Sequence, residues 1–173
     1  KMIITIGGLA GTGTTTVTEL LSEKLDIPSI SSGSIFRQMA KERGMSVLEF
    51  SEFAENNKDI DIEIDNRQCE VAKSSENLII EGRLSAYFVE ADLKVWLITP
   101  FDVRSAMIAD REDKSIDLAM DEIKIRENSE ALRYKDIHDI DISSMDIYDL
   151  VINSGKFLPE EIASIIINTL KVI

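Results

Sequence analysis

Residues 2–16, MIITIGGLAGTGTTT, decide the fold of this chain. The apolar, β-branched run at 3–6 is typical of a buried strand. Four glycines follow within seven residues, and the apolar positions of 17–25 then form one stripe along a helix. A strand, a glycine-rich loop and a helix in this order indicate a phosphate-binding loop. Glycines let successive backbone N–H groups converge on an anion, and the helix N-terminus adds its partial positive charge.

The loop departs from the usual P-loop pattern at one position. Gly8 and Gly13 have the spacing of GxxxxGK followed by Ser or Thr, and Thr15 stands where a hydroxyl binds Mg²⁺. Thr14, however, occupies the position of the lysine. Taken alone, the loop therefore leaves open a simpler interpretation, a tight turn that joins a strand to a helix.

Length, composition and charge bound the class of protein. With 173 residues, 44% of them apolar and 29% charged, the chain has the size and composition of one globular domain. It has one cysteine, no apolar run of about 18 residues and no secretory leader pattern, so we expect a cytoplasmic protein without a membrane partner. The net charge of −13 argues against nucleic acid as a partner.

Strand and helix patterns alternate along the rest of the chain. Further strands are predicted at 27–30, 78–80, 93–98 and 148–152, and helices at 35–44, after Ser46, over 115–134 and from Pro159. Thr99 and Pro100 are expected to cap and begin another helix. The segment 59–65, DIDIEID, alternates like a strand, but we interpret it as helical because no turn signal interrupts the segment through Ala72. The pattern predicts an α/β fold of the P-loop NTPase type, a parallel five-stranded sheet with helices on both faces.

Polar segments follow the predicted strands. They are residues 7–16, 32–33, 81–83 and 153–156. Because ligands of parallel sheets bind at the carboxyl ends of the strands, these segments are expected to surround the binding site.

The arginines form a second pattern. Arg126, Glu130 and Arg133 are spaced to share one helix face, which by itself is explained by an exposed ion-paired surface. Three further arginines follow a predicted turn, follow a strand or lie in the loop-like stretch ADREDKS: Arg37, Arg83 and Arg111. Arginine suits bidentate phosphate recognition, and phosphoryl transfer needs mainly positioning and charge neutralisation.

Taken together, these segments resemble the archaeal type of cytidylate kinase, within the nucleoside monophosphate kinase group of P-loop folds. The resemblance covers nearly the whole chain. It rests on GLAGTGTTT at 8–16, SSGSIFR at 31–37, AKERGMS at 40–46, EIDNRQ at 63–68, EGRL at 81–84, RENSEALRY at 126–134 and YDLVINS at 148–154. Threonine in place of the P-loop lysine is itself a feature of that subfamily.

The resemblance implies an activity and a division of the chain. The activity is transfer of the ATP γ-phosphoryl group to CMP or dCMP with Mg²⁺, giving ADP and CDP or dCDP, in pyrimidine nucleotide metabolism. Residues 1–173 would form one domain, in which helices at about 31–75 bind the acceptor and a lid at about 111–146 closes to exclude water. A monomer is expected, with a homodimer as the alternative.

The resemblance also implies roles for individual residues. The ATP-binding residues are Gly8, Leu9, Ala10, Gly11, Thr12, Gly13, Thr14, Thr15, Thr16 and Arg111, with Thr15 also binding Mg²⁺. The acceptor-binding residues are Ser32, Gly33, Arg37, Asp65, Arg83 and Glu130. The Asp65 carboxylate would accept a hydrogen bond from the cytosine amino group. The catalytic candidates are Arg83, Arg126 and Arg133, and on lid closure Arg126 or Arg133 would replace the charge of the absent lysine.

Other interpretations remain open at this point. A kinase of the same fold acting on AMP, UMP or shikimate is one, and a P-loop domain that binds nucleotide without turnover, given Thr14, is another. A GTPase-like switch is disfavoured, because Ile60 stands where an NKxD motif beginning at Asn57 needs its second aspartate.

Simple structural roles are expected for several other residues. His138, flanked by acidic residues, is expected at the surface, and Trp96 in the core. Glu81 is interpreted either as an acid that holds a Mg²⁺-bound water or as a cap for Gly82.

Overall fold

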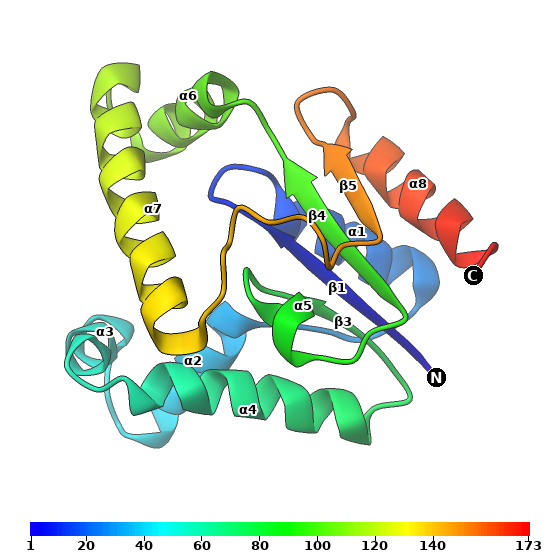
Figure 1. The fold of residues 1–173 in the computed structure, drawn as a ribbon, viewed down its shortest axis with the longest axis horizontal. Coiled ribbons are helices and arrows are strands. Elements are labelled where there is room, and N and C mark those ends of the chain that lie inside the picture. The colour runs from blue at the N-terminus through cyan, green and yellow to red at the C-terminus, as the bar shows by residue number, and fades with distance from the viewer.

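Residues 1–173 are described by a computed structural model, whose centre is a five-stranded parallel sheet (Figure 1). The strands are β1 (Met2–Gly8), β2 (Ser29–Ser31), β3 (Asn77–Glu81), β4 (Leu93–Ile98) and β5 (Leu150–Asn153). Their spatial order is β2-β3-β1-β4-β5, and every neighbouring pair is parallel. The predicted five-stranded parallel sheet is therefore confirmed.

Eight helices surround the sheet. They are α1 (Thr14–Leu25), α2 (Ser32–Glu42), α3 (Val47–Glu55), α4 (Asp59–Ser74), α5 (Ser85–Phe88), α6 (Phe101–Glu112), α7 (Ile116–His138) and α8 (Pro159–Leu170). Helices α1 and α8 pack side by side on one face, and α4 and α5 lie over the other (Figure 1). The segment 59–65 is helical, as predicted, and lies at the start of α4.

The main core lies between the sheet and the helices α1 and α8. Its fully buried members come from the strands and from these two helices, among them Ile6, Leu21, Leu97 and Ile166. A smaller cluster around Ile80 and Val89 fills the opposite face, beneath α4 and α5. Burial on both faces explains why the strand sequences are continuous apolar runs and do not alternate.

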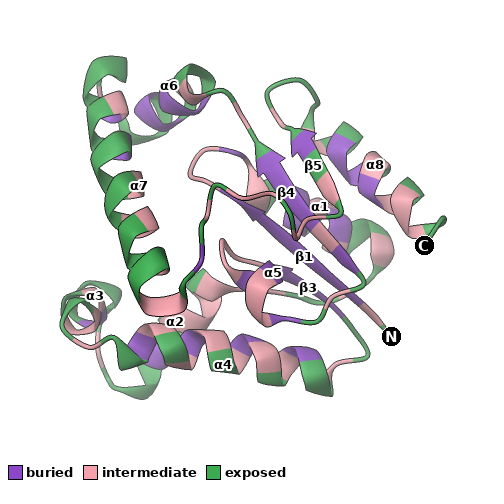
Figure 2. Ribbon diagram, viewed as in Figure 1, coloured by how far each residue is buried: buried purple, intermediate pink, exposed green.

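Two arms extend from the sheet, and each has a small core of its own. In the first arm, α2, α3 and α4 pack around the fully buried Phe50. In the second, α6 and α7 pack through Ile108, Ala109, Ala119 and Ile123. Helix α7 buries only the last two of these, and Figure 2 shows most of its length exposed. The apolar contacts of this long helix are therefore confined to its N-terminal part, and polar side chains make its other contacts.

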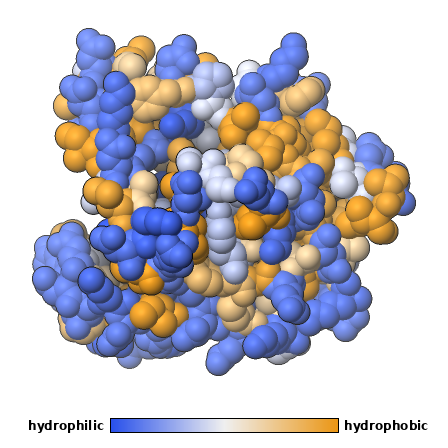
Figure 3. Space-filling model, viewed as in Figure 1, coloured by the Kyte–Doolittle hydropathy of each residue, from blue (hydrophilic) through white to orange (hydrophobic).

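The surface agrees with the acidic composition. Hydrophilic residues cover most of the lower edge of the view in Figure 3, over α3 and α4. None of the helices combines the length and the apolar character that a bilayer-spanning segment needs.

Several predicted boundaries and positions are wrong. Strand β2 begins at Ser29, after Pro28, and not at residue 27. Pro100 was expected as the first residue of a helix, but it is the N-cap of α6, which begins at Phe101. Arg111 lies in the last turn of α6 and not in a loop. The strand predicted at 148–152 is β5, two residues later at its start. The four-residue α5 has no apolar period long enough to be predicted.

A buried ion pair joins α6, α7 and the glycine-rich loop. The Arg104 side chain is 8% exposed and lies 2.7 Å from Glu127 Oε1 on α7. The same guanidinium group donates to the carbonyl oxygen of Ala10 at 3.0 Å. Arg104 thus adds a polar contact between the second arm and the loop, beside the packing of Ala10 on the apolar cluster of that arm.

We expect Arg104→Met to destabilise the protein by about 3 kcal/mol, because it leaves the Glu127 carboxylate buried without its partner. The double variant Arg104→Met/Glu127→Met removes both charges and should recover most of that loss. Urea denaturation of the four proteins of this cycle measures both effects. Additive losses in the double variant would contradict a coupled pair.

Candidate active site

The glycine-rich loop is shaped to bind an anion. Gly11 and Gly13 have φ values of 82° and 84°, in the left-handed region that glycine adopts without strain. Gly13 is the N-cap of α1, no side chain caps this helix, and its first turn has no acidic residue. The backbone N–H groups and the positive end of the helix dipole are therefore available to a phosphate.

The Glu81 carboxylate links this loop to the end of β3. Its Oε2 atom accepts hydrogen bonds from Thr14 Oγ1 at 2.7 Å and from Thr15 Oγ1 at 2.9 Å. Of the two interpretations of Glu81, the structure agrees with an acid beside the P-loop hydroxyls. The backbone N–H of Gly82 instead donates to Ile6 O, within the sheet.

A first cavity, of about 630 Å³, lies over the glycine-rich loop and is here named the phosphate cavity. Its lining combines the loop with arginines from three other segments. The lining residues predicted to bind ligands are Gly8, Leu9, Ala10, Gly11, Gly13, Thr14, Thr15, Thr16, Ser32, Gly33, Arg37, Arg83 and Arg111. Thr12, also predicted, is instead buried and donates its hydroxyl to Leu9 O.

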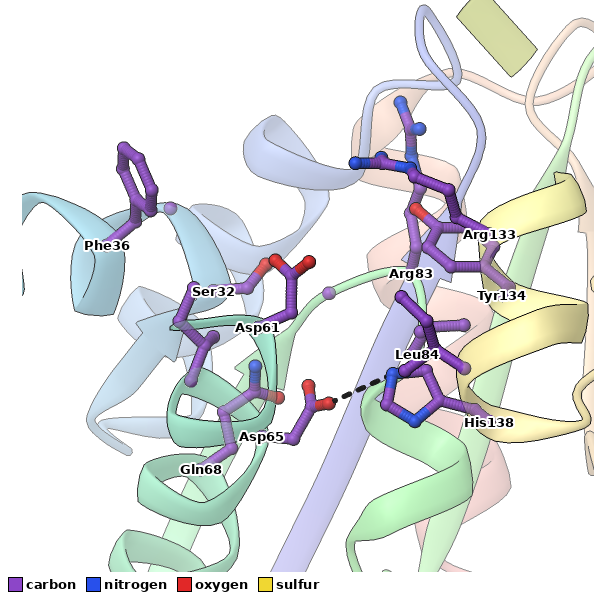
Figure 4. A pocket seen from close by; sticks show the side chains of 14 residues that line it. Ser32, Phe36, Asp61, Asp65, Gln68, Arg83, Leu84, Arg133, Tyr134 and His138 are labelled. Carbon is purple, nitrogen blue, oxygen red and sulfur yellow. Dashed lines mark ion pairs between the residues drawn. The ribbon is translucent and has the colours of Figure 1, made fainter. Parts of the chain in front are cut away.

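A second cavity, of about 320 Å³, lies between α4 and the C-terminal half of α7 and is here named the acceptor cavity (Figure 4). Four of its lining residues, Ser32, Gly33, Gly82 and Arg83, also line the phosphate cavity. The two cavities therefore meet where α2 begins and β3 ends. Asp65 and Arg133, both predicted site residues, line the acceptor cavity as well.

Arg83 is held by an ion pair with Glu130 of α7. Glu130 also accepts from Arg126 Nε at 3.2 Å, and the Glu130 side chain is only 13% exposed. The structure thus brings Arg83 and Glu130 together, as expected of residues in one site. Arg126 is 69% exposed and lines neither cavity.

Comparison with known proteins agrees with this geometry. The sequence matches the Cytidylate kinase-like family over residues 3–156. The chain belongs to this family. It is 73% identical to the cytidylate kinase of Methanobrevibacter smithii over 99% of this chain and 100% of that protein. It is 46% identical to the cytidylate kinase of Archaeoglobus fulgidus over 99% and 96% of the two chains.

Solved structures show how widely the fold is shared. An uncharacterized protein from Eubacterium ventriosum superimposes with a TM-score of 0.77 at 19% identity, covering 99% of both chains. Shikimate kinase from Bacteroides thetaiotaomicron gives a TM-score of 0.65 at 18% identity, covering 98% of both. At these identities the likeness concerns the fold alone, which this cytidylate kinase-like chain shares with kinases of other acceptors.

His138 lies in the acceptor cavity of this family member, so the expectation of a surface position is wrong. The side chains of His138 and Asp65 are 13% and 16% exposed, and His138 Nε2 lies 3.5 Å from Asp65 Oδ2 (Figure 4). Burial, followed by the charge of Asp61, raises the pKa of Asp65 to about 7. The sequence around His138 is acidic, but α7 continues through it and turns the imidazole inward.

Two further residues of the site were missed in the sequence. Arg104 supports the loop from behind, and Gln68 lines the acceptor cavity with its side chain almost wholly buried. Gln68 falls three residues after Asp65, on the same helix face, and this spacing is the signal that could have found it. Trp96, as expected, is buried in the sheet.

The residues present suit Mg²⁺ but form no metal site by themselves. No group of three or more His, Cys, Asp or Glu side chains is arranged to bind a metal ion. The Thr15 hydroxyl and the Glu81 carboxylate offer oxygen atoms beside the loop. Mg²⁺ is commonly held by one or two such protein groups together with the phosphates of a nucleotide, so this donor set fits the ion.

We expect Asp65→Asn to stabilise the protein increasingly as the pH rises. The pKa of Asp65 is about 7 in the folded chain against an ordinary 3.8, so between these values the folded state holds a proton that the unfolded state has lost. Stability is therefore lost as the pH rises through this window, and asparagine avoids that loss. The gain in melting temperature should grow from about pH 5 to pH 7 and then level off.

The exposed Asp136→Asn variant on α7 is the control, and its effect on melting temperature should not depend on pH in this range. A gain for Asp65→Asn that is equal at all pH values would contradict the raised pKa.

Proposed function

We propose that this protein transfers the γ-phosphoryl group of ATP to CMP, and to dCMP, giving ADP and CDP or dCDP. Membership of the cytidylate kinase-like family and the names of its close relatives support this assignment. The single observation that carries it is the meeting of the two cavities at Ser32, Gly33, Gly82 and Arg83. A phosphoryl group bound over the P-loop would face an acceptor phosphate at this junction, as transfer in line requires.

On the donor side, the loop amides and the N-terminus of α1 would bind the ATP phosphates. Thr15 and Glu81 would hold Mg²⁺, which when bound neutralises phosphate charge. The Glu81 carboxylate keeps the two threonine hydroxyls in fixed positions. Arg111, on the last turn of α6, would contact the nucleotide from the opposite side of the phosphate cavity.

On the acceptor side, Arg83 and Arg37 would bind the α-phosphate of CMP, since both line the phosphate cavity near its junction with the acceptor cavity. Arg83 must then exchange its Glu130 partner for phosphate oxygens, or bind both. Glu130 lines neither cavity, so its contact with the acceptor would be made through Arg83 until the lid closes. Asp65 would accept a hydrogen bond from the cytosine amino group.

The charge of the absent P-loop lysine must come from elsewhere, because the Thr14 hydroxyl is neutral and donates to Glu81. We assign this role to an arginine of α7, Arg126 or Arg133, on closure of the lid. Both lie on α7, whose apolar packing is confined to its N-terminal part. A rotation of α7 that releases its polar contacts at Glu130 and His138 would carry the two arginines toward the phosphates. Closure would also exclude water and prevent hydrolysis of ATP.

The two arms have separate roles in this proposal. The helices of residues 31–75 bind the acceptor, residues 111–146 form the lid, and all belong to one domain. The protein would act as a monomer on ATP and CMP in the cytoplasm, in pyrimidine nucleotide metabolism, without nucleic acid or a membrane as partner. The surplus of acidic residues supports the absence of a nucleic-acid partner.

A coupled assay of ADP release, with ATP and Mg²⁺ and each of CMP, dCMP, UMP, AMP and GMP in turn, tests the activity. Turnover should be fastest with CMP or dCMP. Turnover with AMP alone would keep the kinase and overturn the acceptor. The absence of ADP release with all five would favour the alternative that Thr14 raises, a domain that binds nucleotide without transfer.

We expect Arg133→Ala and Arg126→Ala to lower kcat by about ten-fold or more, with at most a small change in ATP affinity, because these arginines would meet the phosphates only after closure. Lys135→Ala is the matched control, an exposed cation on the same helix that lines neither cavity. Its kcat should equal that of the wild type. If either arginine variant lost much of its ATP affinity with kcat unchanged, that arginine would not replace the charge of the P-loop lysine in the transition state.

A further inference from the structure

Gln68 is the only amide side chain that lines the acceptor cavity. It is 2% exposed, and glutamine is seldom buried to this degree. Its Oε1 atom accepts a hydrogen bond from Ser85 Oγ at 2.6 Å, and Ser85 is 1% exposed. The structure gives the amide nitrogen no acceptor, and Figure 4 shows that nitrogen on the side facing Asp61.

Ser85 has little freedom to release this amide. It begins α5 directly after the segment 81–84, and its hydroxyl lies against Gly82, where a Cβ atom would overlap it. The hydroxyl group therefore stays between the glycine and the amide. Since the Gln68 oxygen is occupied by Ser85, the NH₂ group is the part of the amide left for the cavity.

The carboxyl group of Asp65, a hydrogen-bond acceptor, lies beside the NH₂ group of Gln68, a donor. Asp65 and Gln68 are three residues apart on α4, so their side chains share one face of the helix, and both line the acceptor cavity. Above its pKa of about 7, Asp65 offers carboxylate oxygens, and Gln68 offers N–H groups. The wall of the cavity thus presents an acceptor next to a donor.

This order matches one pyrimidine and opposes the other. Cytosine carries an amino group at C4, which donates, next to the ring nitrogen N3, which accepts. Uracil carries a carbonyl oxygen at C4 next to an N3–H group, so the donor and the acceptor are exchanged. Against uracil, the Asp65 carboxylate would face an oxygen, and the Gln68 amide would face another N–H group. Each mismatch leaves a buried polar group unpaired.

We propose that Gln68 determines the specificity of this site for cytosine, donating from its amide to cytosine N3 while Asp65 accepts from the amino group, and that Ser85 is the positioning residue that fixes the amide. This inference rests on the proposed function, since it concerns the acceptor of the same reaction. It gives roles to Gln68, the last residue of the segment EIDNRQ, and to Ser85, neither of which received one from the sequence.

Equilibrium binding of CMP and of UMP, measured by calorimetry without ATP, tests the proposal. Gln68→Met keeps the length of the side chain and removes the donor. It should weaken CMP binding by about ten- to a hundred-fold, the usual cost of an unpaired buried group, and should leave UMP binding unchanged or improve it. Ser85→Ala frees the amide to turn its oxygen toward uracil N3–H, so the CMP-to-UMP affinity ratio should fall by a smaller factor.

The other glutamine of the chain supplies the control. Gln38 on α2 is exposed and lines neither cavity, so Gln38→Met should leave both affinities at wild-type values. ATP affinity, measured separately, should be equal in all four proteins, since Gln68 and Ser85 do not line the phosphate cavity.

A merely structural role for Gln68 predicts a different result. If Gln68→Met lowers CMP and UMP affinity by the same factor, or lowers neither, the proposal is overturned. Should that variant fail to fold, Ser85→Ala decides in its place, and an unchanged CMP-to-UMP ratio there overturns the proposal equally.

Binding and turnover separate this inference from the proposed function. A wild-type protein that binds CMP in preference to UMP, loses that preference on Gln68→Met and yet releases no ADP would keep the inference and remove the kinase activity. If the wild-type protein phosphorylates CMP and the Gln68→Met variant has the same CMP-to-UMP affinity ratio as the wild type, the kinase activity is kept and the inference is removed.

Discussion

The Glu81 carboxylate at the end of β3 holds the P-loop to the sheet, and the arrangement of the site depends on this contact. Strand β3 lies between β1, which leads into the loop, and β2, which leads into the first arm of α2, α3 and α4. Glu81 is in register with Ile6 of β1 and with Ser31 of β2. Glu81 therefore lies between the P-loop and the start of α2, and the strand continues directly into Gly82 and Arg83, where the two cavities meet.

A second constraint is the net charge of −13, against which the site must gather cations for phosphate. Two of its arginines are each held by a carboxylate of α7, since Arg83 pairs with Glu130 and Arg104 pairs with Glu127. These two ion pairs have different consequences for the site. Arg104 also donates to the loop carbonyl of Ala10 and so has a supporting position, whereas Arg83 lines both cavities. Helix α7 is thus coupled to the loop through one arginine and to the junction of the two cavities through another.

The features predictable from the sequence were those with a local cause. Strand β1, its glycines and helix α1 form a contiguous pattern, and the apolar runs at 78–80 and 93–98 could be assigned because both faces of the sheet are buried. The site residues that were missed depend on contacts between distant segments. His138 is flanked by acidic residues, and only the position of α7 against α4 shows that it faces Asp65. Arg104 lies four residues beyond Pro100 in an unremarkable helix, and only the fold shows that it reaches Ala10.

Helix α4 shows how one sequence can serve a core and a binding site at once. Ile60 and Ile64 pack into the core of the first arm, whereas Asp61 and Asp65, each one residue further along, turn by about 100° toward the acceptor cavity. The strand-like alternation of DIDIEID is completed by Ile62, which is 43% exposed and lines neither cavity. The packing of Ile60 and Ile64 fixes the orientation of α4 about its axis. It therefore also fixes the direction in which the two carboxylates and Gln68 face the cavity. The burial that raises the pKa of Asp65 is thus a consequence of packing that also gives the cavity its fixed polar groups.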